Sequence, residues 1–517
     1  MLAPFDSIKP IPLAAKLYCR NALLQTDSVC KNIMLEKGDD GPYVAKRPGL
    51  RPTMNLTGLG IGTNFQGMSA IGAGTTSDSD VLVICGDYLV SLNKILQGLG
   101  AGALSAIPLT GGVGTQVASS LYQCANVVTS SSVYIILQSS QFIFLWGYLG
   151  AGVWSKLGTS ASQPLVPSIC ELDGTFYIMD KGGKIWASEL NNPTSWPVLN
   201  YVPLGDAVGS PVRLAVHLNY LVAFCTDSIT MYYDAAISPG APIAKVTSAI
   251  FTEGISSYGS RTVQEMDDVM YWLGGSSVTG FVINRMRGLT IEKISTPTIE
   301  RLLAKYFLPA DADAHTLSQI TYPSSPRAYT VRAAGHSFYI LSSPAYTDIY
   351  GTAKPGLTLS FDTDNGEWHW WTQVSDTNVE AEWGIGGALP MRSYGTVAMP
   401  HLSTGQIYTL DGDYYRDGYK PINVQVQTPS INFGNQRTKL IPATYLHADT
   451  SSTSVDISWS DDDYATFCTP ITLSLATPKK QLIRCGSMTE RAWRVTHTDN
   501  APLYLYNMLP ELQPGAL

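Results

Sequence analysis

Short apolar runs, separated by turns rich in glycine and aspartate, follow one another through most of this chain. Two apolar runs joined by a brief polar segment form the pattern of a β-hairpin, because glycine and aspartate supply the backbone angles of tight turns. Seven such hairpins are predicted, over residues 81–84 with 88–92, 133–137 with 142–146, 176–179 with 184–188, 220–225 with 230–233, 269–273 with 280–283, 337–341 with 357–361, and 406–410 with 414–415.

The hairpins recur about every 40–50 residues, which is the period of a four-stranded propeller blade. One small twisted sheet cannot bury both of its faces alone, so such sheets stack around a common axis. The pattern therefore predicts an all-β chain whose central part is a β-propeller of six or seven blades. Adjacent hairpins sharing one blade would lower that number.

The pattern changes near residue 420. Strict alternation of apolar and polar residues over 422–427, 440–446, 455–460 and 493–498 is typical of half-buried strands. We expect three units: lead-in strands over 1–60, the propeller over 61–424 and an antiparallel β-sandwich over 425–517. A short helix is predicted over 298–305, capped by the sequence Ser295-Thr296-Pro297, and the glycine-rich stretch 98–114 is expected to form an exposed loop.

Composition argues against a nucleic-acid-binding, disulfide-linked or membrane-inserted protein. Charged residues make up only 14% of the 517 residues, and the formal net charge is −8, which is not the basic footprint of a nucleic-acid-binding domain. The eight cysteines form no Cys-x-x-Cys pair and are expected to be reduced. The N-terminus has no signal-peptide pattern, and the most apolar stretch, 133–146, contains a polar turn, so neither export nor membrane insertion is expected.

A search for catalytic patterns found no phosphate-binding loop, dinucleotide fingerprint, zinc-protease motif or nucleophile elbow. The seven histidines are scattered singly, and we interpret them as structural; His336 is expected to bond a neighbouring blade. The sequence therefore predicts no catalytic, cofactor-binding or metal-binding residues and no cofactor. The histidines lie at positions 217, 315, 336, 369, 401, 447 and 497.

Three sequence features offer candidate site residues: two acidic runs, three arginines and an aromatic run. The acidic runs Asp461-Asp462-Asp463 and Asp411-Gly412-Asp413 allow metal binding or catalysis, but turn chemistry is favoured, because Ser460-x-Asp462 resembles the Asp-box turn of sialidase-type propellers. An arginine cluster for a sugar carboxylate would need arginines at several blade centres, and Arg261, Arg285 and Arg332 stay open for that role. The aromatic run around His369 (Trp368, Trp370 and Trp371) could contact a sugar or a protein, but an outer strand with alternate rings buried is favoured.

Six segments in order resemble the packaged-DNA stabilisation proteins, the tail hubs of short-tailed phages. They are the opening Asn32-Ile33-Met34-Leu35-Glu36 with Ala45 to Leu50; Leu172 to Phe176 with Trp186 to Leu190 and Trp196; Glu253-Gly254-Ile255 with Val269 to Gly274; Ser295 to Glu300; Ala328-Tyr329 with Gly335 to Tyr339 and Leu357 to Asp362; and Val455 to Asp462 with Arg491 to Val495. The stretch from Leu204 to Pro211 and Tyr464 in the acidic turn depart from the family pattern, which indicates a distant member.

The resemblance implies a structural virion protein, not an enzyme, made in the host cytoplasm and located in the phage tail. It would form a homo-oligomeric ring, expected to be a hexamer, below the portal and adaptor proteins. There it would close the DNA channel, retain the packaged genome and dock needle, fibre or spike proteins, without contact with a membrane. Genomic DNA would pass through without sequence-specific binding, and an acidic lumen would favour that passage.

Two other functions compete with the tail hub. A propeller glycosidase or depolymerase of the tail would carry a carboxylate pair about 5–9 Å apart in a pocket on the propeller axis. A lectin-like propeller would show aromatic pockets at equivalent positions of several blades, whereas the spacing of tryptophans here is irregular.

Overall fold

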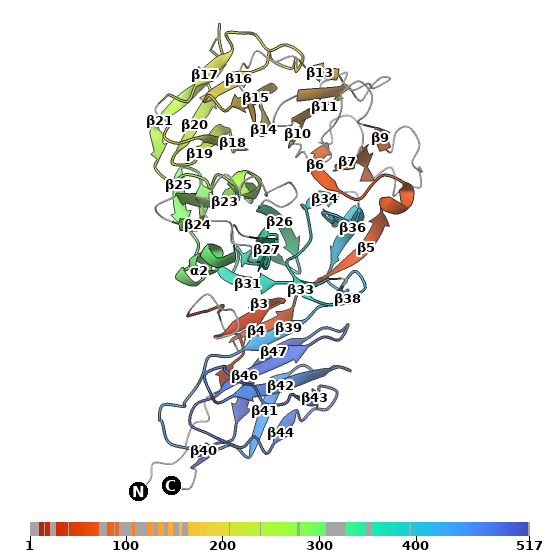
Figure 1. The fold of residues 1–517 in the computed structure, drawn as a ribbon, viewed down its shortest axis with the longest axis vertical. Helices are drawn as coiled ribbons and strands as arrows, with labels where there is room; N and C mark the ends of the chain where they lie inside the picture. The colour runs from red at the N-terminus through yellow and green to blue at the C-terminus, as the bar shows by residue number, and fades with distance from the viewer. Residues whose placement is uncertain are drawn as a thin grey trace.

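The computed structural model describes most of the chain. The described part comprises all residues except 1–9, 15, 21–26, 40, 72–79, 87, 93–105, 109–122, 129–132, 139–142, 148–154, 158–163, 206, 238, 277–279, 307–325, 348–352, 376, 392–393 and 515–517. Of the predicted loop over 98–114, only 106–108 lies within it, and these residues form a strand, β9. In Figure 1 the sheets form a ring above a second unit.

Seven four-stranded antiparallel arrangements make up the ring within the described residues. The first strand of each lies toward the axis, where β6, β10, β14 and β18 contact one another in succession (Figure 1). These inner strands are β6 (Phe65–Ile71), β10 (Gln123–Val128), β14 (Leu165–Leu172), β18 (Pro211–His217), β22 (Gln264–Met266), β26 (Arg327–Ala333) and β34 (Leu389–Met391).

The remaining strands continue outward from each inner strand. The second strands are β7 (Asp80–Cys85), β11 (Val133–Gln138), β15 (Thr175–Asp180), β19 (Tyr220–Cys225), β23 (Val269–Ser276), β27 (His336–Ser343) and β35 (Thr396–Pro400). The third strands are β8 (Tyr88–Ser91), β12 (Ile143–Gly147), β16 (Lys184–Ala187), β20 (Ile229–Asp234), β24 (Gly280–Arg287), β30 (Leu357–Asp362) and β36 (Gln406–Asp411). The fourth strands are β9 (Ala106–Pro108), β13 (Ser155–Leu157), β17 (Tyr201–Pro203), β21 (Ile243–Phe251), β25 (Thr290–Lys293), β31 (Glu367–Trp371) and, in the last blade, β5 (Gly49–Asn55).

The last blade takes its fourth strand from the N-terminal part of the chain. β5 pairs antiparallel with β36, with Gly49 opposite Asp411 and Asn55 opposite Gln406, and β34 contacts β6 of the first blade. This pairing ties the two ends of the ring together. Within the described residues the propeller has seven blades, so the predicted all-β propeller is confirmed with the larger of the two predicted blade numbers.

Six of the seven predicted hairpins are the second and third strands of blades one to six, one hairpin to each blade. The prediction of the seventh hairpin, 406–410 with 414–415, is wrong. β36 pairs with β35 and β5 instead of residues 414–415, and the chain beyond it forms the short strands β37 (Arg416–Asp417) and β38 (Lys420–Pro421). The Asp411-Gly412-Asp413 turn therefore does not fold the chain back onto β36.

The second unit combines strands from both ends of the chain. One sheet has the order β3-β4-β47-β41-β44, with β1 beside β47, and the other includes β2-β39-β46-β42-β43. Side chains from both sheets share one apolar cluster, including Ile33, Val426, Trp493 and Met508. The strands are β1 (Ile11–Pro12), β2 (Val29–Lys31), β3 (Ile33–Gly38), β4 (Gly41–Lys46), β39 (Val424–Gln427), β41 (Ala443–Ala448), β42 (Ser454–Ser460), β43 (Ile471–Ser474), β44 (Gln481–Ile483), β46 (Ala492–His497) and β47 (Tyr504–Pro510).

The two units share a sheet. β2 pairs with β31, the fourth strand of the sixth blade, through Lys31 and Trp370, and then with β39, which makes one sheet of nine strands. Strands form at all four positions predicted after residue 420. The sandwich topology and the boundaries at residues 60 and 424 stay predictions.

The described α-helix α2 (Pro297–Tyr306) confirms the predicted helix and begins one residue earlier. The Ile299 amide donates to Thr296 Oγ1 at 3.4 Å, and Ser295 Oγ donates to Glu300 Oε1 at 3.0 Å, so the predicted cap is formed. Its buried Ile299 and Leu302 belong to the core shared by blades five and six. No described helix is long and apolar enough to cross a membrane. Seven cysteines are free thiols, and the side chain of Cys124 lies outside the described part.

Candidate functional site: the axial pocket

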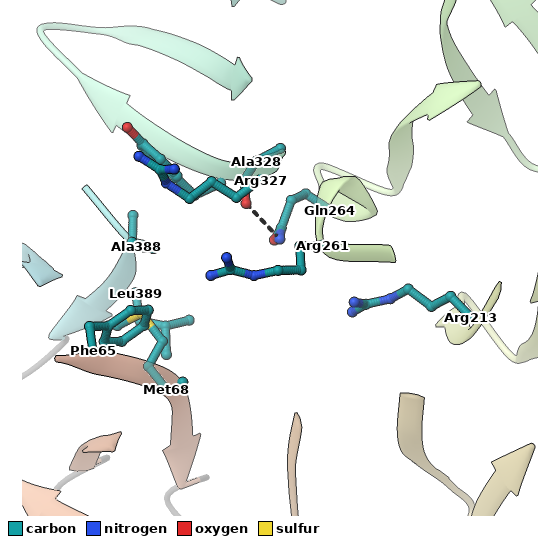
Figure 2. A pocket seen from close by; sticks show the side chains of 13 residues that line it. Phe65, Met68, Arg213, Arg261, Gln264, Arg327, Ala328, Ala388 and Leu389 are labelled. Atoms are coloured by element: carbon teal, nitrogen blue, oxygen red, sulfur yellow. Dashed lines mark hydrogen bonds between the residues drawn. The ribbon is translucent and has the colours of Figure 1, made fainter. Parts of the chain in front are cut away.

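A cavity of about 200 Å³ lies where the inner strands of the propeller meet. Its lining comes from β6, β18, β22, β26 and the segment 386–389 at β34, together with the 3-10 turn η2 (Gly259–Thr262). These elements belong to five different blades or their connections, so the cavity lies on the propeller axis. Figure 2 shows three arginines around it: Arg213, Arg261 and Arg327.

The three arginines are held differently. Arg327 is 1% exposed and donates from Nε to the Ile385 carbonyl at 2.7 Å and from Nη2 to the Trp383 carbonyl at 3.0 Å. It therefore fastens blade six to the chain that enters blade seven. Arg213 is half-buried and donates from Nη1 to the Ser260 carbonyl, and Arg261 is 8% exposed. In Figure 2 the guanidinium groups of Arg213 and Arg261 point in the same direction across the pocket.

The electrostatic environment of the pocket is basic. No aspartate or glutamate occurs among its lining residues in the described part of the chain. Burial, together with the nearby charge of Arg261, lowers the pKa of Arg213 to about 10. Arg213 Nε is buried and has no hydrogen-bond partner among the described residues. The pocket lining is therefore basic, and it includes one buried N–H donor, Arg213 Nε, without a partner among the described residues.

The opposite wall of the pocket is apolar. Phe65, Met68 and Leu389 lie together there in Figure 2. Gly386 and Gly387 let β6 approach, because a Cβ at Gly386 would lie 2.2 Å from the Phe65 ring and one at Gly387 would lie 2.8 Å from Met68 Sδ. The glycines therefore set the contact between the last blade and the first.

Of the three arginines left open by the sequence, only Arg261 lies at the axis. Arg285 is bound to Glu292, with its Nε 2.8 Å from Oε2, and Arg332 is bound to Asp267; both pairs lie at the surface. Sequence reasoning missed Arg213 and Arg327. The only available signal was an arginine inside an apolar inner strand, which has no distinctive motif around it.

The carboxylates of the acidic runs are engaged in local contacts. Asp462 accepts the Thr466 amide at 2.9 Å and the Ser460 hydroxyl at 2.7 Å, and hydrogen bonds led by the Thr466 hydroxyl lower the pKa of Asp462 to about 2. Asp461 accepts two bonds from Arg491, and Asp463 accepts one from Arg20. The Asp413 amide donates to Asp411 Oδ1 at 2.9 Å. The Asp-box interpretation as a turn fits these contacts.

His336 lies where the sixth blade meets the second unit. Its Nδ1 is 2.7 Å from Asp362 Oδ2, on the same blade, and its Nε2 is 3.1 Å from Glu36 Oε2, on β3. The prediction that His336 bonds a neighbouring blade was wrong, because strand β3 of the second unit, and not a blade, covers this edge. The hydrogen bond to Asp362, followed by that to Glu36, raises the pKa of His336 to about 9.

His336, Asp362 and Asp364 bring together the ligand types that hold divalent cations, with the ligand atoms within 4.8 Å of one another. With a pKa of about 9, the metal-free imidazole is protonated at neutral pH and donates from both nitrogens to the neighbouring carboxylates. Asp364 Oδ2 also accepts the Ser337 amide at 2.8 Å. The arrangement acts as an ion-pair network.

The aromatic run of β31 is buried on both faces. Trp368 packs in the core between blades five and six, whereas Trp371 packs against Trp383 at the edge toward blade seven, with ring centroids 5.0 Å apart. Trp370 is half-buried beneath Lys31. Tryptophans on both faces of β31 therefore pack in cores, whereas the prediction had only alternate rings buried. His369 is 1% exposed, neither of its ring nitrogens has a partner among the described residues, and burial lowers its pKa to about 4.

The other histidines are dispersed. His217 lies 3.3 Å from Glu265, and His497 contacts Thr453 at 2.9 Å and Lys46 at 3.4 Å. His401 Nδ1 lies 3.3 Å from the Ser403 amide nitrogen, and His447 is exposed. His315 lies outside the described residues.

The sequence of the chain matches the model of one protein family. The model of the family described as "Bacteriophage P22 Gp10, beta-propeller" matches residues 46–352, more than half of the 517 residues. This range begins before β5 and extends into the sixth blade. No curated protein sequence matches the chain.

Similar solved structures share little sequence with the chain. The N-terminal domain of Nup159 is 10% identical over 74% of this chain and 98% of its own, with a TM-score of 0.38. The computationally designed Ika8 protein is 10% identical over 70% of this chain and 99% of its own, with a TM-score of 0.35. BBS1N, in its complex with ARL6DN, is 8% identical over 71% of this chain and 98% of its own, with a TM-score of 0.39.

Proposed function

This chain belongs to the bacteriophage P22 Gp10 β-propeller family, and from that membership we propose that it is the tail hub, or nozzle, of a short-tailed phage. In this role it binds below the portal and adaptor proteins, closes the DNA channel and retains the packaged genome. The observation that carries the proposal is the family match over residues 46–352, which coincides with a propeller closed by its own N-terminal strand. We propose no enzymatic activity and no cofactor for the chain.

The firm connection between the two units supports a structural role in the virion. A continuous nine-stranded sheet joins blade six to the second unit, and Arg47, fully buried, bonds Asp417 with Nη1 3.0 Å from Oδ1. A shared sheet and a buried ion pair resist separation of the two units better than a linker does. Such a subunit would keep its shape against the pressure of a packaged genome.

Ring formation would use surfaces that stay uncovered in the single chain. The loop over 188–200 in blade three exposes three aliphatic side chains, with Leu190 66%, Val198 69% and Leu199 74% exposed. Exposed apolar side chains gathered in one loop are typical of a protein contact. We propose that copies of the chain form a hexameric ring, whose distal side docks needle, fibre or spike proteins.

The chain's net charge of −8 supports passage of DNA without adhesion if acidic groups line the lumen of the ring. No sequence-specific DNA contact is needed for that role. The protein would be made in the host cytoplasm and carried in the virion tail. The basic axial pocket belongs to the interior of each propeller, not to the proposed lumen between the subunits.

Inactivation of the gene in the phage tests this function. The proposal predicts that heads still package DNA but lose it during purification, and that mass spectrometry finds the chain in wild-type particles. Particles that keep their genome and remain infectious without the chain would refute a role in retention. A plasmid supplying the protein in the host should restore stable particles, which controls for effects on neighbouring genes.

A further inference from the structure

Lys480 is a buried lysine whose charge has little compensation within the described part of the chain. It is 5% exposed, its Nζ donates to Thr450 Oγ1 at 3.3 Å, and it forms no ion pair among the described residues. A buried ammonium group is unfavourable unless charged or polar partners replace the water that it loses. Each of the other buried lysines in that part has a carboxylate or carbonyl oxygen within 2.8 Å; they are Lys31, Lys46 and Lys439.

The Lys480 side chain lines a pocket of about 340 Å³ on the second unit. The lining comes from the start of β4, from β41 and β47, and from the residues just before β44. The Leu446 amide donates to the Lys480 carbonyl at 2.9 Å, which fixes Lys480 beside β41. The described lining contains the basic side chains of Lys480 and His447 and no carboxylate. Asp449, next to the pocket, accepts the Tyr506 hydroxyl at 3.0 Å.

A second polar group of this pocket also lacks a partner. Asn507 lies directly opposite His447 on the neighbouring strand, and its buried Oδ1 has no hydrogen-bond partner among the described residues. A carboxamide oxygen accepts hydrogen bonds from hydroxyl or amine groups. One pocket therefore holds a poorly compensated cation and an unused acceptor, which fits a molecule that carries both an anionic group and a hydroxyl.

The type of cation favours a phosphate over a carboxylate. A guanidinium group matches a planar carboxylate through two parallel hydrogen bonds, but no arginine occurs in the described lining. An ammonium group is a point charge that can meet any oxygen of a phosphate. A phosphate ester carries a charge of about −1.5 to −2 at pH 7, so it gains more from Lys480 than a carboxylate does. Pro42, Leu446 and Pro478 offer apolar contacts to a carbon skeleton.

We propose that this pocket binds a small hydroxylated phosphate ester of the size of a sugar phosphate. Its phosphate group meets Lys480, and one of its hydroxyl groups donates to Asn507 Oδ1. The site lies on the second unit, and it is independent of the proposed role in the virion.

Isothermal titration calorimetry of the full chain at pH 7, in a phosphate-free buffer of low ionic strength, tests the site. Glucose 6-phosphate is the probe, and it should bind. Glucose should give no binding heat, and glucuronate and inorganic phosphate should bind more weakly than the probe. Lys480→Met should weaken binding of glucose 6-phosphate by about tenfold or more, as expected for loss of a charged hydrogen-bonding partner. Lys479→Met is the matched control, because Lys479 is exposed and outside the lining, and it should keep wild-type affinity.

Circular dichroism establishes that each variant is folded. Should Lys480→Met fail to fold, Asn507→Asp carries the test, since its carboxylate repels the phosphate and should lower the affinity by about tenfold or more. The proposal is overturned if folded wild-type protein does not bind glucose 6-phosphate, or if glucose, glucuronate or inorganic phosphate binds as tightly. Wild-type affinity in the folded pocket variant, or an equal loss in Lys479→Met, would overturn it as well.

Discussion

His336 Nε2 lies 3.1 Å from Glu36 Oε2, so an ion pair joins the sixth propeller blade to the N-terminal strand β3 of the second unit. The same imidazole bonds Asp362 through Nδ1. Asn365 adds to the network by donating to the Leu35 carbonyl at 2.7 Å and to Asp362 Oδ2 at 2.8 Å. The junction between the units therefore contains a titratable group whose charge holds it together.

The first prediction concerns pH. The folded-state pKa of His336, about 9, lies above the unfolded value of 6.5, so its stabilising effect is complete below pH 6.5 and is lost as pH rises through 9. Because the site is partly solvated, we expect a loss of about 2 kcal/mol between pH 6.5 and 9.5. Urea denaturation of wild-type protein and His336→Gln at both pH values measures it.

In His336→Gln the difference between the two pH values should change by this contribution, while the contribution of Lys46, whose pKa burial lowers to about 7, is the same in both proteins. His447→Gln, which changes an exposed histidine, should keep the wild-type difference. An unchanged pH dependence in His336→Gln would show that another group is responsible.

The second prediction concerns the buried pair of Arg47 and Asp417. Arg47 is fully buried, bonds both carboxylate oxygens and stacks over Trp383 at 4.6 Å. Asp417→Asn leaves the guanidinium without its counter-charge and should lower the free energy of unfolding by about 3–5 kcal/mol. Glu292→Gln, at the exposed pair with Arg285, should cost under about 1 kcal/mol in the same urea titration. Equal losses would contradict this account of the pair.

The third prediction concerns closure of the ring. A Cβ added at Gly386 would lie 2.2 Å from the Phe65 ring, so Gly386→Ala should force blades seven and one apart and destabilise the protein by about 2 kcal/mol or more. Gly412→Ala is the matched control, because nothing lies within 4 Å of its added Cβ. Thermal unfolding compares the two, and a Gly386→Ala protein as stable as the control would be inconsistent with the described contact.

The fourth prediction concerns Asp462 in the acidic turn. Its oxygens accept bonds from Ser460 and Thr466, so the carboxylate acts within the turn and not as a calcium ligand. Added Ca²⁺ should not change the Tm of the wild-type protein. Asp462→Asn should lower the Tm equally with and without Ca²⁺. A Ca²⁺-dependent rise in Tm that Asp462→Asn abolishes would assign a metal to this turn.

The sequence predicted those structural elements that are determined by residues close together along the chain, such as hairpins and helix caps. The strand pair containing Phe176 and Ile185 was predictable because a Gly-containing turn joins two short apolar runs. The helix starting at Pro297 was predictable from its cap. The family resemblance was likewise carried by ordered local segments.

Features that join remote parts of the chain were not predictable. β36 pairs with β5, so Gln406 lies opposite Asn55, and no local pattern indicates that register. For the same reason Glu36 was not recognised as the partner of His336. The arginines Arg213 and Arg327 lie in no distinctive motif, and only the closed ring brings their strands to one axis.

Cryo-electron microscopy of purified virions tests the central claim most directly. The account predicts that this propeller, with its second unit, repeats as a six-fold ring on the tail axis directly below the portal and adaptor. Its absence from the particles, or a location only at the tail periphery as a detachable monomer or trimer, would contradict the hub assignment.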